Sequence, residues 1–155
     1  MKKTVIVALA AGGLAAFPAL APADNAPVAA VKADLAKLQA DVSAARTALV
    51  ADAEKLAADA AAAKGTAPQA ARAAVKPDVQ KLHMDLVAAR AALNTDHAQL
   101  KIDLTAAKQV QGAAKELRPL LKSTRAGVRQ ERSAIRAELA KARQALRDLR
   151  ASFNK

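Results

Sequence analysis

Large apolar residues in the first half of the chain recur at the spacing of one helix face. Steps of three, four, seven and seven residues separate Leu35, Leu38, Val42, Leu49 and Leu56. At about 100° per residue, these steps keep all five side chains on one narrow stripe. Alanine, the residue with the highest helix propensity, fills many positions between them. The pattern predicts a long amphipathic helix with a thin apolar seam.

Charged residues follow the two edges of this stripe. Asp34, Asp41, Asp52 and Asp59 are separated by seven, eleven and seven residues. Each step returns to within about 20° of the same direction, so these aspartates form one acidic edge. Arg46 and Lys64 are eighteen residues apart, which is five helical turns, and they lie on the opposite, basic edge.

The same pattern occurs twice. Residues 31–64 align without gaps to residues 75–108, and the apolar stripe, the acidic edge and the basic edge all recur. We interpret this as an internal duplication that encodes two similar helices.

Proline and glycine residues indicate where the helices begin and end. Gly65 and Gly112 are typical of helix ends, and proline is favoured in a first turn. We expect helix one over about 27–64, helix two over about 67–111 with a kink or break near Pro77, and helix three over about 119–153. Short connections predict an all-α antiparallel three-helix bundle spanning residues 24–155. The alternative is a coiled-coil-like hairpin of long, kinked helices that self-associates.

The third expected helix carries a row of bases beside its apolar seam. The seam consists of Leu121, Val128, Ile135, Leu139, Leu146, Leu149 and Phe153. The bases recur at steps of three, four and seven residues, within about 80° of arc. They are the candidate binding residues for an anionic partner: Arg118, Lys122, Arg125, Arg129, Arg132, Arg136, Arg143, Arg147 and Arg150.

The order of the edges constrains how the helices can pair. Antiparallel neighbours bring like edges together, whereas parallel neighbours oppose an acidic edge to a basic one. Helices one and three are parallel in a three-helix bundle, so we expect the acidic edge of residues 34–59 to meet the bases of helix three. Four acids cannot neutralise nine bases, and the surplus remains for solvent or a partner.

The first 23 residues resemble a secretory signal peptide. Lys2 and Lys3 precede the apolar segment Val5–Phe17, and Ala21-Pro22-Ala23 provides small residues for cleavage before Asp24. We therefore expect a periplasmic or secreted bacterial protein. The alternative is a retained membrane anchor, because Thr4–Ala23 is uncharged over about the length that a span requires.

The residues that usually carry catalysis are scarce. The chain contains no cysteine, so it has neither disulfides nor a thiolate nucleophile. His83 and His97 lack a third ligand at metal-binding spacing, and neither a Ser–His–acid set nor a glycine-rich phosphate loop is visible. We expect no enzymatic activity, no metal and no cofactor.

Positive charge is concentrated in the last third of the chain, where residues 115–155 hold 12 bases and 4 acids. The first hypothesis is a binding module for an anionic envelope polymer or membrane surface. The second is a structural or chaperone-like coiled-coil protein that acts by self-association or helix–helix contacts. Nucleic acid is disfavoured by export and by the scarcity of aromatic residues that could stack on bases, because the chain has two phenylalanines and neither tyrosine nor tryptophan. Charge runs also occur as solvated faces.

Overall fold

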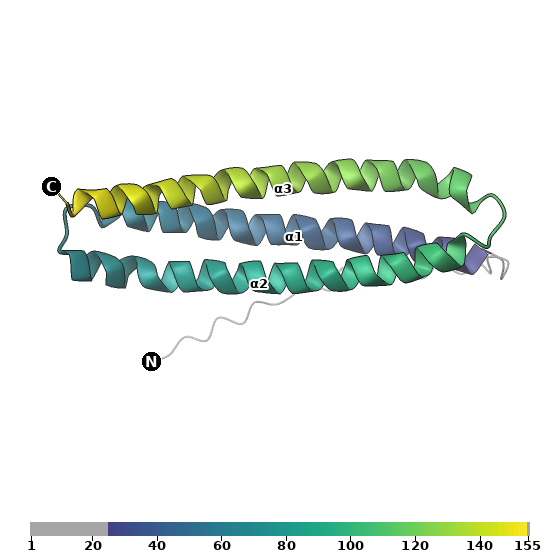
Figure 1. Ribbon diagram of the computed structural model, residues 1–155, viewed down its shortest axis with the longest axis horizontal. Coiled ribbons are helices and arrows are strands. Elements are labelled where there is room, and N and C mark those ends of the chain that lie inside the picture. Colours follow the sequence, from purple (N-terminus) through teal and green to yellow (C-terminus); the bar gives the residue numbers. More distant parts are fainter. Residues whose placement is uncertain (1–24, 155) are drawn as a thin grey trace, which may run out of the picture.

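The computed structural model describes residues 25–154, which form three long helices (Figure 1). Helix α1 comprises Ala26–Ala62, α2 comprises Pro68–Ala107 and α3 comprises Ala113–Ser152. There is no strand among the described residues, so the expected all-α class is confirmed. The expected signal peptide, its alternative as an anchor and the cleavage site before Asp24 lie outside the described residues.

Successive helices run in opposite directions, so that α1 and α3 are parallel and α2 is antiparallel to both (Figure 1). Each connection is five residues long, 63–67 and 108–112. Gly65 and Gly112 adopt φ values of 85° and 83°, a left-handed conformation in which a side chain would be strained. Short connections with a left-handed glycine fold each helix back on its predecessor.

Two proline residues stand inside helices. α2 continues through Pro77 as one helix. α3 begins at Ala113, earlier than the expected start near Pro119. Proline removes one backbone hydrogen bond, but Ala113 and Leu117 are 3% and 4% exposed, and their burial stabilises the turn that precedes Pro119.

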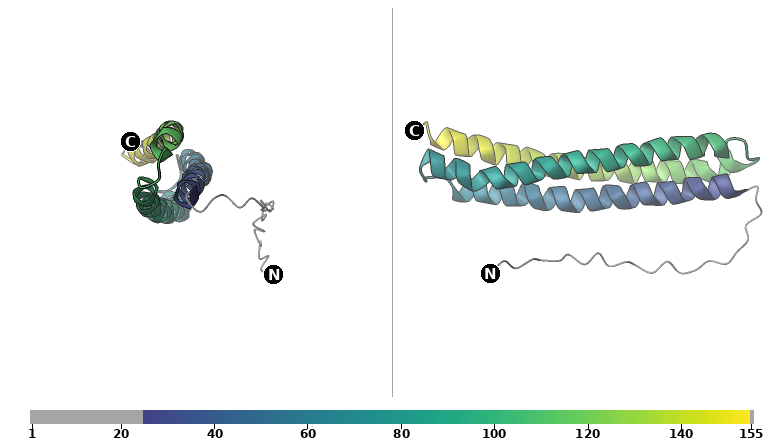
Figure 2. Two further views of the ribbon diagram at one scale, coloured as in Figure 1. Left: turned by 90° about the vertical axis from the view of Figure 1, so that its right-hand side faces the viewer. Right: turned by 90° about the horizontal axis from the view of Figure 1, so that it is seen from below.

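Helix α1 is the central element of the bundle. It packs along both α2 and α3, as the end-on view in Figure 2 shows, whereas the backbones of α2 and α3 approach each other closely at few points. The predicted stripe of α1 supplies the middle of the core, because all five of its members are no more than 4% exposed: Leu35, Leu38, Val42, Leu49 and Leu56.

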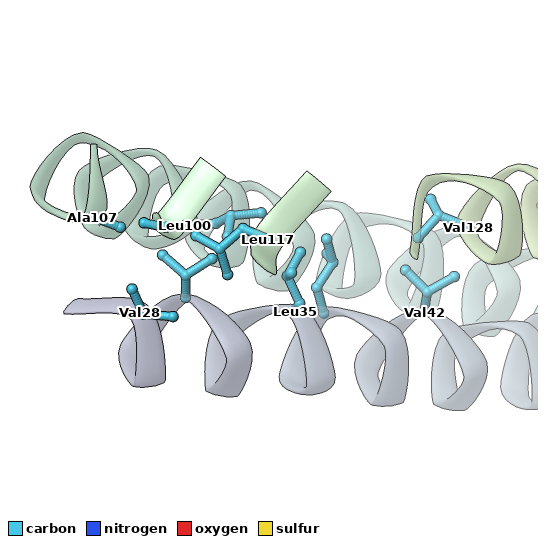
Figure 3. Close-up of a cluster of buried hydrophobic side chains, with 10 residues drawn as sticks. Val28, Leu35, Val42, Leu100, Ala107, Leu117 and Val128 are labelled. Carbon is cyan, nitrogen blue, oxygen red and sulfur yellow. The ribbon is translucent and has the colours of Figure 1, made fainter. Parts of the chain in front are cut away.

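The core divides into two clusters along the bundle. The first joins the beginnings of α1 and α3 to the end of α2, with Val28, Leu35, Val42, Leu100 and Val128 among its members (Figure 3). The second joins the ends of α1 and α3 to the beginning of α2. Each cluster therefore combines the beginning of one repeat with the end of the other.

The outer helices bury only part of their seams. In α3, Val128 and Leu149 are buried, but Leu121, Ile135 and Leu139 are half-buried. In α2, Leu86, Leu93 and Leu104 are likewise half-buried. The seam residues that lie beside the basic edges of α2 and α3 are therefore only partly covered by the rest of the bundle. None of the three described helices is apolar over a length sufficient to cross a membrane.

Candidate anion-binding surface

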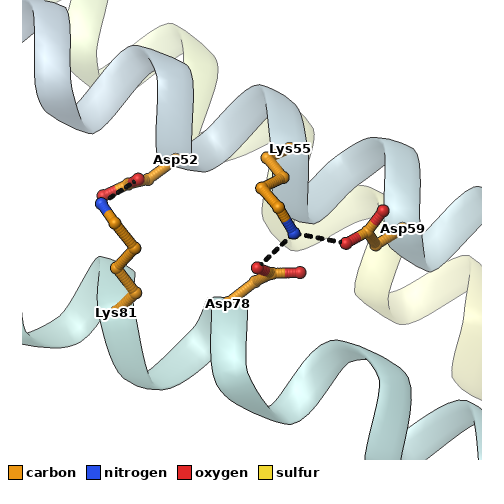
Figure 4. A network of polar contacts seen from close by, with 5 residues as sticks. All are labelled: Asp52, Lys55, Asp59, Asp78 and Lys81. Carbon is orange, nitrogen blue, oxygen red and sulfur yellow. Dashed lines mark hydrogen bonds and ion pairs between the residues drawn. The ribbon is translucent and has the colours of Figure 1, made fainter. Parts of the chain in front are cut away.

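The acidic edge of α1 faces α2 and not α3. Lys37 Nζ donates to Asp41 Oδ2 at 2.8 Å and also binds Asp96 of α2. Lys55 Nζ lies 2.7 Å from Asp59 Oδ2 and 2.6 Å from Asp78 Oδ1 of α2 (Figure 4). The expectation that this edge meets the bases of α3 is therefore wrong for Asp41 and Asp59. Antiparallel pairing brings the two acidic edges together, and lysine side chains on the adjoining strip neutralise them.

The lysine bridges repeat with the sequence duplication. Lys81, which is equivalent to Lys37, binds Asp52, the equivalent of Asp96 (Figure 4). Lys81 Nζ also donates to Asp85 Oδ2 at 2.8 Å. Exchanging the two repeats therefore converts one bridge into the other. The α1–α2 hairpin has an internal pseudo-two-fold relation, made by the duplicated helices.

These bridges stabilise the charged forms of their members. Hydrogen bonds from Lys37, Lys55 and Lys81 lower the pKa of their i+4 aspartate partners, Asp41, Asp59 and Asp85. Hydrogen bonds to the carboxylates in turn raise the pKa of all three lysines above the ordinary 10.5. These three lysines and their i+4 aspartates are therefore charged at neutral pH.

The duplication makes four positions equivalent in pairs, Lys37 with Lys81 and Lys55 with residue 99, and the fourth of them is not a lysine. The duplication places Gln99 at the position equivalent to Lys55, and Gln99 Nε2 donates to Asp103 Oδ2 at 2.9 Å. Asp34 lies beside Asp103, and its buried Oδ2 accepts no hydrogen bond from the described residues. Burial and the neighbouring Asp103 carboxyl raise the pKa of Asp34. This end of the acidic edge therefore carries a local electrostatic conflict.

The parallel helices α1 and α3 do pair an acidic edge with a basic one, but the helix that supplies each edge is the reverse of the one expected. The basic edge of α1 meets acids of α3. Arg46 Nε lies 3.1 Å from Glu131 Oε2, Lys64 Nζ lies 4.0 Å from Asp148 Oδ2, and Lys32 pairs with Glu116. Three of the four acids of α3 are consequently engaged by α1, on the side of the seam away from the nine bases, while Glu138 pairs with Lys141 of its own helix.

All nine predicted bases lie together on the exposed side of α3, and we call them the basic ridge: Arg118, Lys122, Arg125, Arg129, Arg132, Arg136, Arg143, Arg147 and Arg150. None forms an ion pair with a carboxylate anywhere in residues 25–154. The ridge is therefore a row of exposed positive charge without internal compensation.

A groove runs beside this ridge, between α2 and α3, and contains two successive hollows of about 660 and 640 Å³. We call it the open groove. Leucines of all three helices line it, with Leu35 and Leu49 of α1 at its floor. Five ridge arginines stand on its α3 wall: Arg125, Arg129, Arg132, Arg136 and Arg143.

The α2 wall of the groove is basic as well. Arg90, Lys101 and Lys108 line it and are exposed. The sequence interpretation did not include these residues among the candidates. The signal was nevertheless present, because the antiparallel arrangement of α2 and α3 brings their basic edges together.

The two histidines also lie along the α2 wall. His97 belongs to one hollow and His83 to the other. No set of three or more potential metal ligands occurs within the described part of the chain. The histidines therefore contribute to the polarity of the groove wall, beside the bases named above.

Comparison with protein-family models, curated proteins and solved structures gives no match to this chain.

Proposed function

We propose that this chain is a non-enzymatic protein of the bacterial cell envelope, periplasmic or secreted, whose basic ridge binds an anionic partner or surface. The observation that carries the proposal is the exposure of all nine ridge bases, none of which pairs with a carboxylate within residues 25–154. Like charges at i,i+3 and i,i+4 spacing destabilise a helix by a few tenths of a kcal/mol per pair. An anionic partner would remove this repulsion.

The test is retention on two anionic probes, immobilised poly-L-glutamate and phosphatidylglycerol-containing vesicles. We expect the wild-type protein to bind at least one of them at about 20 mM salt and to release it near 150 mM, since the Debye length falls to about 8 Å. The ridge variant carries Arg125→Gln, Arg129→Gln, Arg132→Gln and Arg136→Gln. It should lose retention while keeping its helical circular dichroism.

A matched control loses the same number of charges elsewhere. Lys32, Arg46, Lys64 and Lys141 lie outside the open groove and form exposed ion pairs, which contribute little to stability. The control variant replaces these four bases with glutamine. It should retain most of the binding, and equal losses in both variants would show that only net charge matters. Wild-type protein that ignores both probes at low salt would contradict the proposal.

A second candidate function is helix–helix association, either structural or chaperone-like. The half-buried leucines of the open groove favour it, because they leave apolar surface available between α2 and α3. Sedimentation equilibrium over a range of protein concentrations tests self-association. A constant monomer mass would exclude self-association as the mode of action.

A further inference from the structure

We propose that the open groove binds one amphipathic α-helix of a partner protein, with an apolar seam flanked on both edges by acidic residues. This inference rests on the proposed function and specifies the anionic partner of the same surface. The bound helix would lie in the open groove, against residues of α1, α2 and α3, and would complete a four-helix bundle.

The floor of the groove requires an apolar occupant. Leu104 and Leu121 line one hollow, and Leu93 and Leu139 line the other, each half-buried and on an outer helix. Together with the leucines of α1, they make the floor of both hollows apolar between the two walls. Side chains at i, i+3, i+4 and i+7 of an amphipathic helix can bury this floor.

The walls require acids on both edges of that occupant. The five ridge arginines stand on one side, and Arg90, Lys101 and Lys108 stand on the other. Opposed like charges repel each other, and the backbones of α2 and α3 approach each other less closely than either approaches α1. An acid-flanked helix would neutralise both walls and replace this repulsion with ion pairs.

The dimensions suit a helix of moderate length. Groove residues of α3 extend from Leu121 to Arg143, which corresponds to about 33 Å at 1.5 Å per residue. A partner helix of about 22 residues would span this distance. The bases of the two groove walls are distributed along this whole length. They can therefore face acids that recur in each heptad of the partner helix.

Other occupants satisfy only part of this pattern. A phospholipid carries its charge at one end, whereas the walls are charged throughout. A polyanion has no apolar seam for the leucine floor. A second copy of the chain offers helices with an acidic edge on one side and a basic edge on the other. The segment 1–23 contains no acidic residue.

The experiment compares two labelled peptides of equal length and composition by fluorescence anisotropy at low salt. The seam peptide has leucine at positions a and d and glutamate at e and g of each heptad. The permuted peptide contains the same residues without a seam. We expect the protein from Asp24 onward to bind the seam peptide at least about tenfold more tightly than the permuted peptide, because only the seam peptide can bury the floor.

A variant of the α2 wall tests whether both walls are used. It carries Arg90→Gln, Lys101→Gln and Lys108→Gln, all at exposed positions. We expect this variant and the ridge variant each to weaken seam-peptide binding by about tenfold or more, since each exposed pair can contribute up to about a factor of five. The control variant should bind within about twofold of wild type. Circular dichroism verifies that all variants remain folded.

The outcomes separate this inference from the proposed function. Equal binding of the two peptides, or an α2-wall variant that binds normally, would overturn the groove inference and leave a ridge that acts by charge alone. Binding of vesicles or poly-L-glutamate without binding of the seam peptide would also overturn it, in favour of a membrane or polymer. Failure of every anionic probe would overturn both proposals.

Discussion

The missing fourth lysine bridge leads to a specific prediction for stability. Gln99→Lys should increase the free energy of unfolding at neutral pH, because the duplication places residue 99 where Lys55 binds two aspartates in the other repeat. The new ammonium group should contact Asp103 on its own helix and Asp34 on α1. It would thereby relieve the conflict that raises the pKa of Asp34.

The magnitude follows from two ion pairs. An i,i+4 pair contributes about 0.3–0.5 kcal/mol, and a second, partly buried pair contributes up to about 1 kcal/mol. The total of about 1 kcal/mol corresponds to a rise in Tm of about 3–5 °C for a helical domain of this size. Thermal and urea unfolding at pH 7, followed by circular dichroism, measure this gain.

The pH dependence tests the cause of the gain. Because the pKa of Asp34 is raised in the folded state, the contribution of Asp34 to wild-type stability is fully present below the ordinary value of 3.8 and is lost as the pH rises through the folded-state value. The benefit of Gln99→Lys should therefore appear above that range and vanish in acid. The reciprocal change Lys55→Gln should lower Tm at pH 7. If Gln99→Lys gave the same gain at pH 3 as at pH 7, or no gain at pH 7, the bridge explanation would be refuted.

Three further predictions concern packing, pH and a connection. Leu49→Ala should lower the free energy of unfolding by about 2.5–4 kcal/mol, because Leu49 is 3% exposed. The equivalent change Leu93→Ala should lower it by about 1 kcal/mol, because Leu93 is half-buried. Urea midpoints would show the contrast, and equal losses in the two variants would contradict it. Gly112→Ala should cost about 1 kcal/mol through backbone strain at φ 83°, since no atom lies within 4 Å of the added methyl group, and a Tm equal to wild type would contradict this. The lysine–aspartate network should hold its contribution between the ordinary pKa values of 3.8 and 10.5. The contribution should decline in acid as the pH falls through the lowered aspartate pKa values, and in alkali as the pH rises through the raised lysine pKa values. A titration of Tm against pH measures both declines. They should be smaller in the triple variant Lys37→Gln, Lys55→Gln, Lys81→Gln than in the wild-type protein.

The apolar stripe of α1 could be predicted from sequence because a central helix with neighbours on both sides buries its whole stripe. The equivalent residues of α2 were less predictable. Leu93 matches Leu49 in the repeat but faces the open groove, because α2 has only one close neighbour. Periodicity identifies the seam of a helix, whereas the rotation of that helix about its axis depends on which neighbours cover it.

The electrostatic pairing was only partly predictable. The edge rule correctly separates parallel from antiparallel neighbours, but the acidic edge of α1 could in principle pair with either. Lys37 and its equivalent Lys81 decide between these choices, because they place ammonium groups beside the joined acidic edges. With those acids neutralised within the hairpin, the basic ridge of α3 is left to face solvent and the groove.

The pseudo-two-fold relation of the α1–α2 hairpin has a consequence for assembly. An interface whose two halves are interchangeable is isologous, like the contact of a symmetric homodimer. If the connection 63–67 opened, α1 of one chain would find on α2 of another the same bridges from Lys37 and Lys81 that it makes within its own chain. Exchange of hairpin arms between two molecules would therefore preserve every α1–α2 contact, so that the length of the 63–67 connection, more than the chemistry of the interface, keeps the hairpin within one chain.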